Sequence, residues 1–127
     1  MENRAHMGEI HQNFTSWMKS LAFCKDELST WQNRLDEVAS RNNNSEILKQ
    51  VEHFQNQFIR QREVIDILNH DLKLADAALA QNAAENPVAS DRRLFEQPEG
   101  LKDQFETFEK IYSELKAEFE KFLSPVL

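Results

Sequence analysis

The sequence predicts an all-α protein, an antiparallel three-helix bundle of long coiled-coil-like helices. Glycine and proline are scarce, with two and three copies among 127 residues, which disfavours turn-rich β folds. Apolar residues recur at alternating steps of four and three along three segments, whereas a strand would need a period of two. We therefore expect one helical-bundle domain over residues 1–127.

The first segment predicts a helix over about residues 7–41. Its apolar seam steps by four and three without a break, through Ile10, Phe14, Trp17, Leu21, Cys24, Leu28, Trp31, Leu35 and Val38. A repeat averaging 3.5 residues keeps one face of a helix against a partner. Asparagines and a serine follow at 42–45, with Asn43 and Glu46 at capping-box spacing. This pattern indicates a tight turn, after which the next helix runs antiparallel.

The second segment predicts a helix over about residues 44–84. Its seam contains one polar residue and runs through Ile47, Val51, Phe54, Phe58, Gln61, Ile65, Leu68, Leu72, Ala75 and Leu79. Folding the hairpin at Asn43 brings Cys24 level with Gln61. The one polar position of the second seam therefore falls in the same layer as the cysteine of the first seam. We interpret Cys24 and Gln61 as candidate register residues, because a lone polar seam residue can align helices at some cost in stability.

Residues 85–97 interrupt the pattern and predict a connector, since Asn86-Pro87 and Pro98 disfavour helical geometry before each proline. Within it, Leu94 and Phe95 either cover the open end of the bundle or form a docking motif. We favour the first interpretation, in which they cover the end of the bundle. A third helix is expected over about 98–124, with the seam Leu101, Phe105, Phe108, Tyr112, Leu115, Phe119 and Phe122.

The second helix has a wider apolar face than one seam requires, with Leu48, Ile59, Val64, Ile67 and Leu74 beside it. A helix that contacts two neighbours needs such width, which favours three packed helices over a lone hairpin. With Trp17 and Trp31 on the first seam, the chain resembles spectrin-type three-helix bundles in shape and periodicity. That resemblance implies long antiparallel helices and carries no ligand or partner with it.

Charge and composition restrict the classes of function. The formal net charge is −7, which disfavours nucleic-acid and membrane-surface binding. The N-terminal residues lack the apolar core of a secretion signal, and no run of apolar residues reaches membrane-spanning length. A single cysteine, Cys24, excludes an intrachain disulfide and fits a reducing compartment. We therefore expect a cytoplasmic protein.

No catalytic or metal-binding pattern is present in the sequence. Di-iron bundles use a Glu-x-x-His motif, which this chain lacks, and His6 and His11 are spaced too poorly to hold one ion. Cys24 has no base predicted beside it, so a small buried apolar residue is the better interpretation. We expect no enzyme activity and no cofactor.

The leading hypothesis is a non-enzymatic interaction or scaffold module that self-associates or binds a protein partner. If the third helix starts level with Ala75 or Leu79, its seven layers end near Phe54 or Phe58. The hairpin end would then be two helices deep and apolar, covered at most in part by the tail of Leu123, Val126 and Leu127. An uncovered apolar cluster of this kind often marks an interface. The candidate interaction surface comprises Leu35, Val38, Ile47, Leu48, Val51, Leu94 and Phe95.

The alternative is a bundle that binds a metal ion or small molecule near the Cys24–Gln61 layer, in stress or redox handling.

Overall fold

The described part of the computed structural model contains three long helices and two short strands. The helices are α1 (Met7–Arg41), α2 (Ser45–Glu85) and α4 (Glu99–Leu123), and the strands are β1 (Arg4–His6) and β2 (Leu94–Glu96). The structure describes residues 4–85, 94–96 and 99–126. Each helix begins and ends within a residue of the range expected from its seam.

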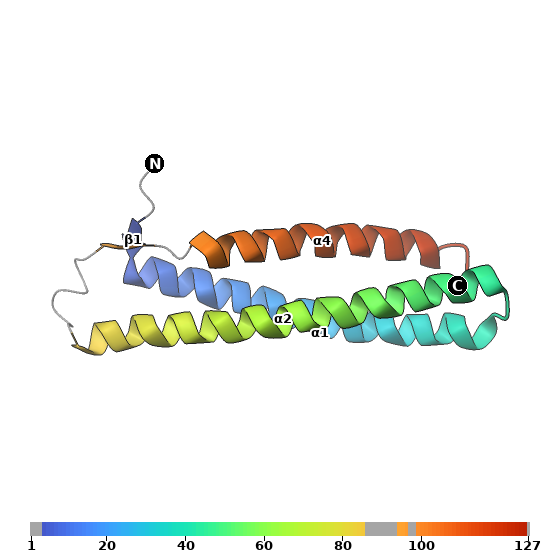
Figure 1. Cartoon of the computed structure of the whole chain (residues 1–127), viewed down its shortest axis with the longest axis horizontal. Helices are drawn as coiled ribbons and strands as arrows, with labels where there is room; N and C mark the ends of the chain where they lie inside the picture. Colours follow the sequence, from blue (N-terminus) through green and yellow to red (C-terminus); the bar gives the residue numbers. More distant parts are fainter. Residues whose placement is uncertain (1–3, 86–93, 97–98, 127) are drawn as a thin grey trace.

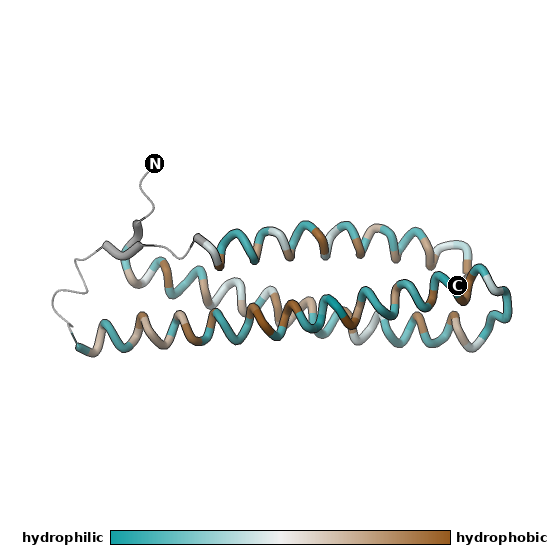
Figure 2. The backbone as a smooth tube through the Cα atoms, in the orientation of Figure 1, coloured by the Kyte–Doolittle hydropathy of each residue, from teal (hydrophilic) through white to brown (hydrophobic). Residues whose placement is uncertain are grey.

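The predicted all-α three-helix bundle is confirmed. In Figure 1 the helices lie side by side along one axis, α1 and α2 joined by a tight turn and α4 running in the direction of α1. The buried side chains follow the three seams, so hydrophobic and hydrophilic residues alternate along each tube in Figure 2. Phe58 and Phe119, which the heptad pattern places at the centre, are almost completely inaccessible to solvent.

Fewer close backbone approaches join α4 to α2 than join α1 to α2. Its seam is mostly aromatic, and rings hold two helix backbones farther apart than aliphatic side chains do. Phe119 packs edge-on against Phe58 and Phe54, with ring centroids 5.0 and 5.2 Å apart. On the other side, Trp31 stacks on Tyr112 at 5.2 Å. The third helix is therefore attached through a layer of rings.

The turn between α1 and α2 is capped by Asn44. Its Oδ1 accepts hydrogen bonds from the backbone N–H groups of Glu46 and Ile47, at 2.9 and 3.3 Å. The capping residue expected from spacing was Asn43, and this expectation is wrong because α2 begins at Ser45, directly after Asn44. These two bonds satisfy donors that the first turn of a helix leaves without partners.

The apolar residues of the hairpin end are mostly buried, where the sequence predicted an open surface, but a pocket remains between α2 and the C-terminal tail beside Ile47. Leu35 and Val38 are fully buried, and Val51 is 8% exposed. The ring of Phe122 lies 5.1 Å from that of Phe54, and Val126 of the C-terminal tail packs against the core beyond it. The sequence allowed the tail of Leu123, Val126 and Leu127 to cover this end in part. Leu123 and Val126 pack against the core, and Leu127 lies outside the described residues.

The other members of the predicted interaction surface divide between two places. Ile47 is partly buried against the core, and Leu48 is 38% exposed. Leu94 and Phe95 lie in β2, which pairs antiparallel with β1 so that His6 is opposite Leu94. Figure 1 places this ladder beside the first turn of α1, where α4 has not yet begun. The side chains of Leu94 and Phe95 lie outside the described part of the structure, so their covering role stays a prediction.

Candidate binding groove between α2 and α4

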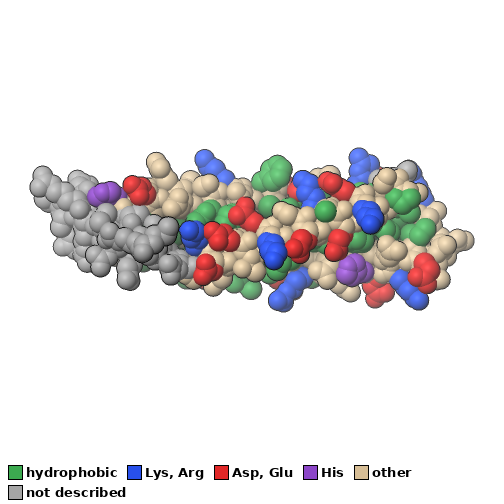
Figure 3. Space-filling model, turned by 90° about the horizontal axis from the view of Figure 1, so that it is seen from above, with side chains coloured by type: hydrophobic (Ala, Val, Ile, Leu, Met, Phe, Trp, Pro, Cys, Tyr) green, Lys and Arg blue, Asp and Glu red, His purple; other side chains and the backbone are tan. Residues whose placement is uncertain are grey.

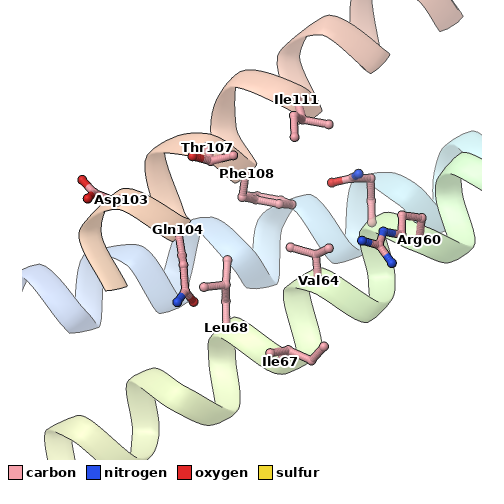
Figure 4. Close-up of a pocket in the computed structure, with 10 residues that line it drawn as sticks. Arg60, Val64, Ile67, Leu68, Asp103, Gln104, Thr107, Phe108 and Ile111 are labelled. Atoms are coloured by element: carbon pink, nitrogen blue, oxygen red, sulfur yellow. The ribbon is translucent and has the colours of Figure 1, made fainter. Parts of the chain in front are cut away.

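A groove of about 420 Å³ runs between α2 and α4 in the middle of the bundle. Its walls are mostly apolar, with one cation and one acid among them: Arg60, Gln61, Val64, Ile67, Leu68, Asp103, Gln104, Thr107, Phe108 and Ile111. In Figure 4, Val64 and Leu68 rise from α2 toward Phe108 and Gln104 of α4. The groove is therefore a joint product of two helices that are far apart in sequence.

The heptad repeat explains why these residues meet. Val64 and Ile67 each directly precede a seam residue of α2, and Thr107 and Ile111 do the same on α4. In antiparallel helices these positions lie on the same side of the interface, so their side chains border one groove. Ile67 is 60% exposed and Ile111 is 44% exposed. The edges of the groove are therefore apolar and open to water.

Gln61 lines this groove and is only 4% exposed. Its Oε1 is buried and has no hydrogen-bond partner. A buried amide left in this state costs about 1–3 kcal/mol relative to a paired one. The sequence identified Gln61 as the polar residue of its seam, and the structure places it beside an opening through which a partner could reach its amide group.

Cys24, the other candidate register residue, does not line this groove. It lies on the side of α1 that faces α4, where its carbonyl oxygen accepts a 3.4 Å hydrogen bond from the Tyr112 hydroxyl. Burial raises the pKa of the Cys24 thiol above its ordinary value, and the nearby Glu27 carboxylate adds to this. The neutral thiol is therefore favoured over a nucleophilic thiolate.

On the side of α4 that faces α1, away from the groove, a cluster of polar side chains joins the two helices. The sequence analysis did not predict this cluster. Glu27 of α1 accepts hydrogen bonds from the Tyr112 hydroxyl and from Lys116 Nζ, the latter at 3.1 Å. Burial raises the Tyr112 pKa, and the hydrogen bond to Glu27 raises it further. The sequence gives only a weak indication of this contact. Glu27 directly precedes a seam residue, and Tyr112 is the one seam aromatic residue with a hydroxyl group.

Helices α1 and α2 are also joined by polar contacts. His11 Nδ1 lies 2.6 Å from Asp76 Oδ1, and Lys25 Nζ donates to Asp66 Oδ1 at 2.7 Å. By contrast, no hydrogen bond or ion pair joins α2 to α4 among residues 4–85, 94–96 and 99–126. The α2–α4 contact is thus held by apolar packing alone.

The wide apolar face of α2 is largely exposed. Leu48, Ile59, Ile67 and Leu74 are 38–60% exposed, whereas Val64 is partly buried. The sequence interpretation, that this width serves contact with two helices of the same chain, is therefore wrong for four of the five residues. The seam residues of α2, with Val64 beside them, form the buried part of its contacts with the other helices.

Charged groups are dispersed over the face that carries α4, with apolar surface between them (Figure 3). In the described part of the chain, no group of three or more histidine, cysteine, aspartate or glutamate residues is placed to hold a metal ion. No described helix is long and apolar enough to cross a membrane. The groove is therefore the best candidate for a functional site in the described structure.

Comparisons with known proteins add no assignment. No protein-family model matches the chain, and no curated protein or solved structure is significantly similar to it. The function is consequently inferred from the groove itself.

Proposed function

We propose that this chain is a non-enzymatic helical interaction module whose α2–α4 groove binds an amphipathic helix of a partner protein. One observation supports this most: the groove has apolar, exposed edges, and its two helices make no polar contact with each other across the described residues. Grooves of this kind receive a helix that inserts apolar side chains spaced by one turn.

Binding a helix in this groove would bury exposed apolar side chains and so contribute favourable free energy. Ile67, Leu74 and Ile111 are 60%, 58% and 44% exposed, and Leu74 follows Ile67 by one heptad on the same edge. Burying apolar surface stabilises a complex by about 25 cal/mol per Å². A bound helix would cover this edge as a fourth member of the bundle, and its other face would remain in water.

A small molecule bound beside Gln61 is the second candidate. The volume of about 420 Å³ fits a drug-sized compound, and Gln61 supplies the single orienting polar group that such sites use. We rank this candidate lower because Ile67 is 60% exposed, so a small ligand against it would remain in contact with water. Cys24 does not line the groove, so this candidate rests on Gln61 alone.

Self-association remains the third candidate. A second copy could offer the same apolar edge, but each chain carries a formal charge of −7. Like charges of this size oppose association, although salt screens the effect beyond about 8 Å. A partner of opposite charge is therefore the better occupant.

Site-specific photo-crosslinking in the cell of origin tests the proposal. A photoreactive residue at Ile67 should trap a distinct protein partner, whereas the same residue at Phe23 should not. Phe23 is the matched control because it is 65% exposed and lies on α1, outside the groove. Equal products from both positions, or none from Ile67, would contradict the proposal. A product with the mass of two copies of this chain would replace the foreign partner with a second copy.

A further inference from the structure

We infer that the helix bound in this groove is basic and carries one amide side chain, Asn or Gln, opposite Gln61. This inference rests on the proposed function and names the chemistry of the partner. It comes from two independent features, the buried Gln61 Oε1 without a partner and the net negative charge of the chain.

Gln61 determines the polar part of the partner. Its Oε1 is buried and has no hydrogen-bond partner among the residues that the structure describes. Rotation about the last side-chain bond exchanges the positions of the oxygen and the NH₂ group, so the groove can present an acceptor or a donor. A partner amide offers both a donor and an acceptor and therefore pairs with either arrangement.

A charged donor suits this position less well. The side chains around Gln61 in the groove include Val64, Leu68 and Phe108, which cannot replace the water lost by an ammonium or guanidinium group. A purely apolar partner would leave the Gln61 amide unpaired in the complex as well. An amide pair avoids both costs, and it also fixes the register of the bound helix as lone polar seam residues do in coiled coils.

The charges around the groove determine the rest of the partner. Asp103 lines the groove. By heptad phase Asp71 lies one repeat beyond Val64 and Glu114 lies one repeat beyond Thr107, whereas Lys110 lies one repeat beyond Asp103. Arg60 is the one cation among the lining residues. With a net charge of −7 for the whole chain, basic residues on the flanks of the bound helix complement this surface.

Three synthetic helical peptides of about 18 residues, long enough for a marginally stable helix, test the inference. The first has a leucine seam with lysine flanks and one central seam glutamine. The second replaces that glutamine with leucine, and the third replaces the lysines of the first with glutamates. Binding is measured by fluorescence anisotropy against the wild-type chain and against Gln61→Leu.

The wild-type chain should bind the glutamine peptide about three- to tenfold more tightly than the leucine peptide, the range expected for one added hydrogen bond. Gln61→Leu should reverse this preference, and the acidic peptide should bind most weakly. Ile67→Glu should abolish binding of the basic peptides, whereas Phe23→Glu should leave it unchanged.

The outcomes separate the two proposals. If Ile67→Glu weakens binding but Gln61→Leu leaves the peptide preference unchanged, the groove binds helices and the amide pairing is wrong. If the acidic peptide binds as well as the basic one, the charge preference is wrong. If neither basic peptide binds, or Ile67→Glu and Phe23→Glu act alike, the proposed function itself fails. Sedimentation that shows a wild-type dimer lost in Ile67→Glu would identify a second copy as the occupant.

Discussion

The two sides of α4 are built differently, although the same helix forms both. Toward α1, Trp31 stacks on Tyr112, and Glu27 accepts hydrogen bonds from Tyr112 and Lys116. Toward α2, the described residues supply no polar contact, and the edge of the groove includes the exposed Ile67. The side toward α1, here called the closed side, is held by stacked rings and hydrogen bonds. The side toward α2 is packed in its interior, but its exposed edge, here called the open rim, is accessible to water.

This difference separates stability from binding within one helix. The side toward α1 holds α4 in place, because stacked rings and a shared carboxylate each require a defined position of the helix. The side toward α2 leaves apolar surface and an unpaired amide at Gln61, both of which a partner could satisfy. Substitutions on the closed side should therefore reduce the free energy of unfolding, and those on the open rim should not.

The largest expected effect comes from Trp31→Ala. Trp31 is 8% exposed and contacts Phe58, Tyr112 and Phe119, so its removal leaves a cavity on the closed side. We expect a loss of about 3–5 kcal/mol in unfolding free energy, measured by urea denaturation. Ile111→Ala on the open rim is the matched substitution and should cost less than about 1 kcal/mol. Similar losses for both would remove the distinction between the two sides.

A smaller loss is expected for Glu27→Ala. The substitution leaves the buried Tyr112 hydroxyl with only the 3.4 Å bond to the Cys24 carbonyl oxygen. The expected loss is about 1–2 kcal/mol, since a buried hydroxyl loses its better partner. Adding Tyr112→Phe to this variant should cost less than Tyr112→Phe costs alone. Asp66→Ala serves as the control, because the Lys25–Asp66 pair is exposed and should contribute less than about 1 kcal/mol.

The closed side should also make stability depend on alkaline pH. Burial raises the pKa values of Tyr112 and Cys24 in the folded chain above their ordinary values of 10.0 and 9.0. Above pH 9–10 the unfolded chain releases these protons and the folded chain keeps them. Stability is therefore fully present below this range and falls as pH rises, by up to about 1.4 kcal/mol per pH unit for each proton. Tyr112→Phe should flatten the decline in thermal melts, and an unchanged slope would contradict the assignment.

Gln61→Leu should act in the opposite direction and stabilise the chain by about 1 kcal/mol. The substitution replaces a buried amide with an unpaired oxygen by an apolar side chain of similar volume. Chemical denaturation measures the gain, with Gln104→Leu on the exposed α4 edge as the control. A loss of stability in Gln61→Leu would mean that the amide is paired in the native state.

The smallest stability effect is expected for Ile67→Glu. This side chain is 60% exposed, so a charge there should change unfolding free energy by less than about 0.5 kcal/mol. The same variant should lose helix binding, which would separate the two properties in a single substitution. A large loss of stability would show that Ile67 supports the fold instead.

The helices themselves could be predicted from the sequence because their determinants are local and repeated. Each seam steps by four and three, and most seam residues are buried in the structure, the others being partly buried against the core. Gln61 was identifiable for the same reason, as the polar member of an otherwise apolar row. The fold class and the polar position beside the groove therefore follow from periodicity.

The candidate groove could not be predicted in the same way, because it is formed by packing between segments that are distant in the sequence. Periodicity did not reveal how far the tail at Val126 would cover the hairpin end, nor that Glu27 would meet Tyr112 and Lys116. It also could not distinguish an apolar residue that contacts a neighbouring helix from one left open to water, such as Ile67. A heptad determines which face of a helix is buried, whereas the size of the aromatic rings and the placement of α4 decide where a groove remains.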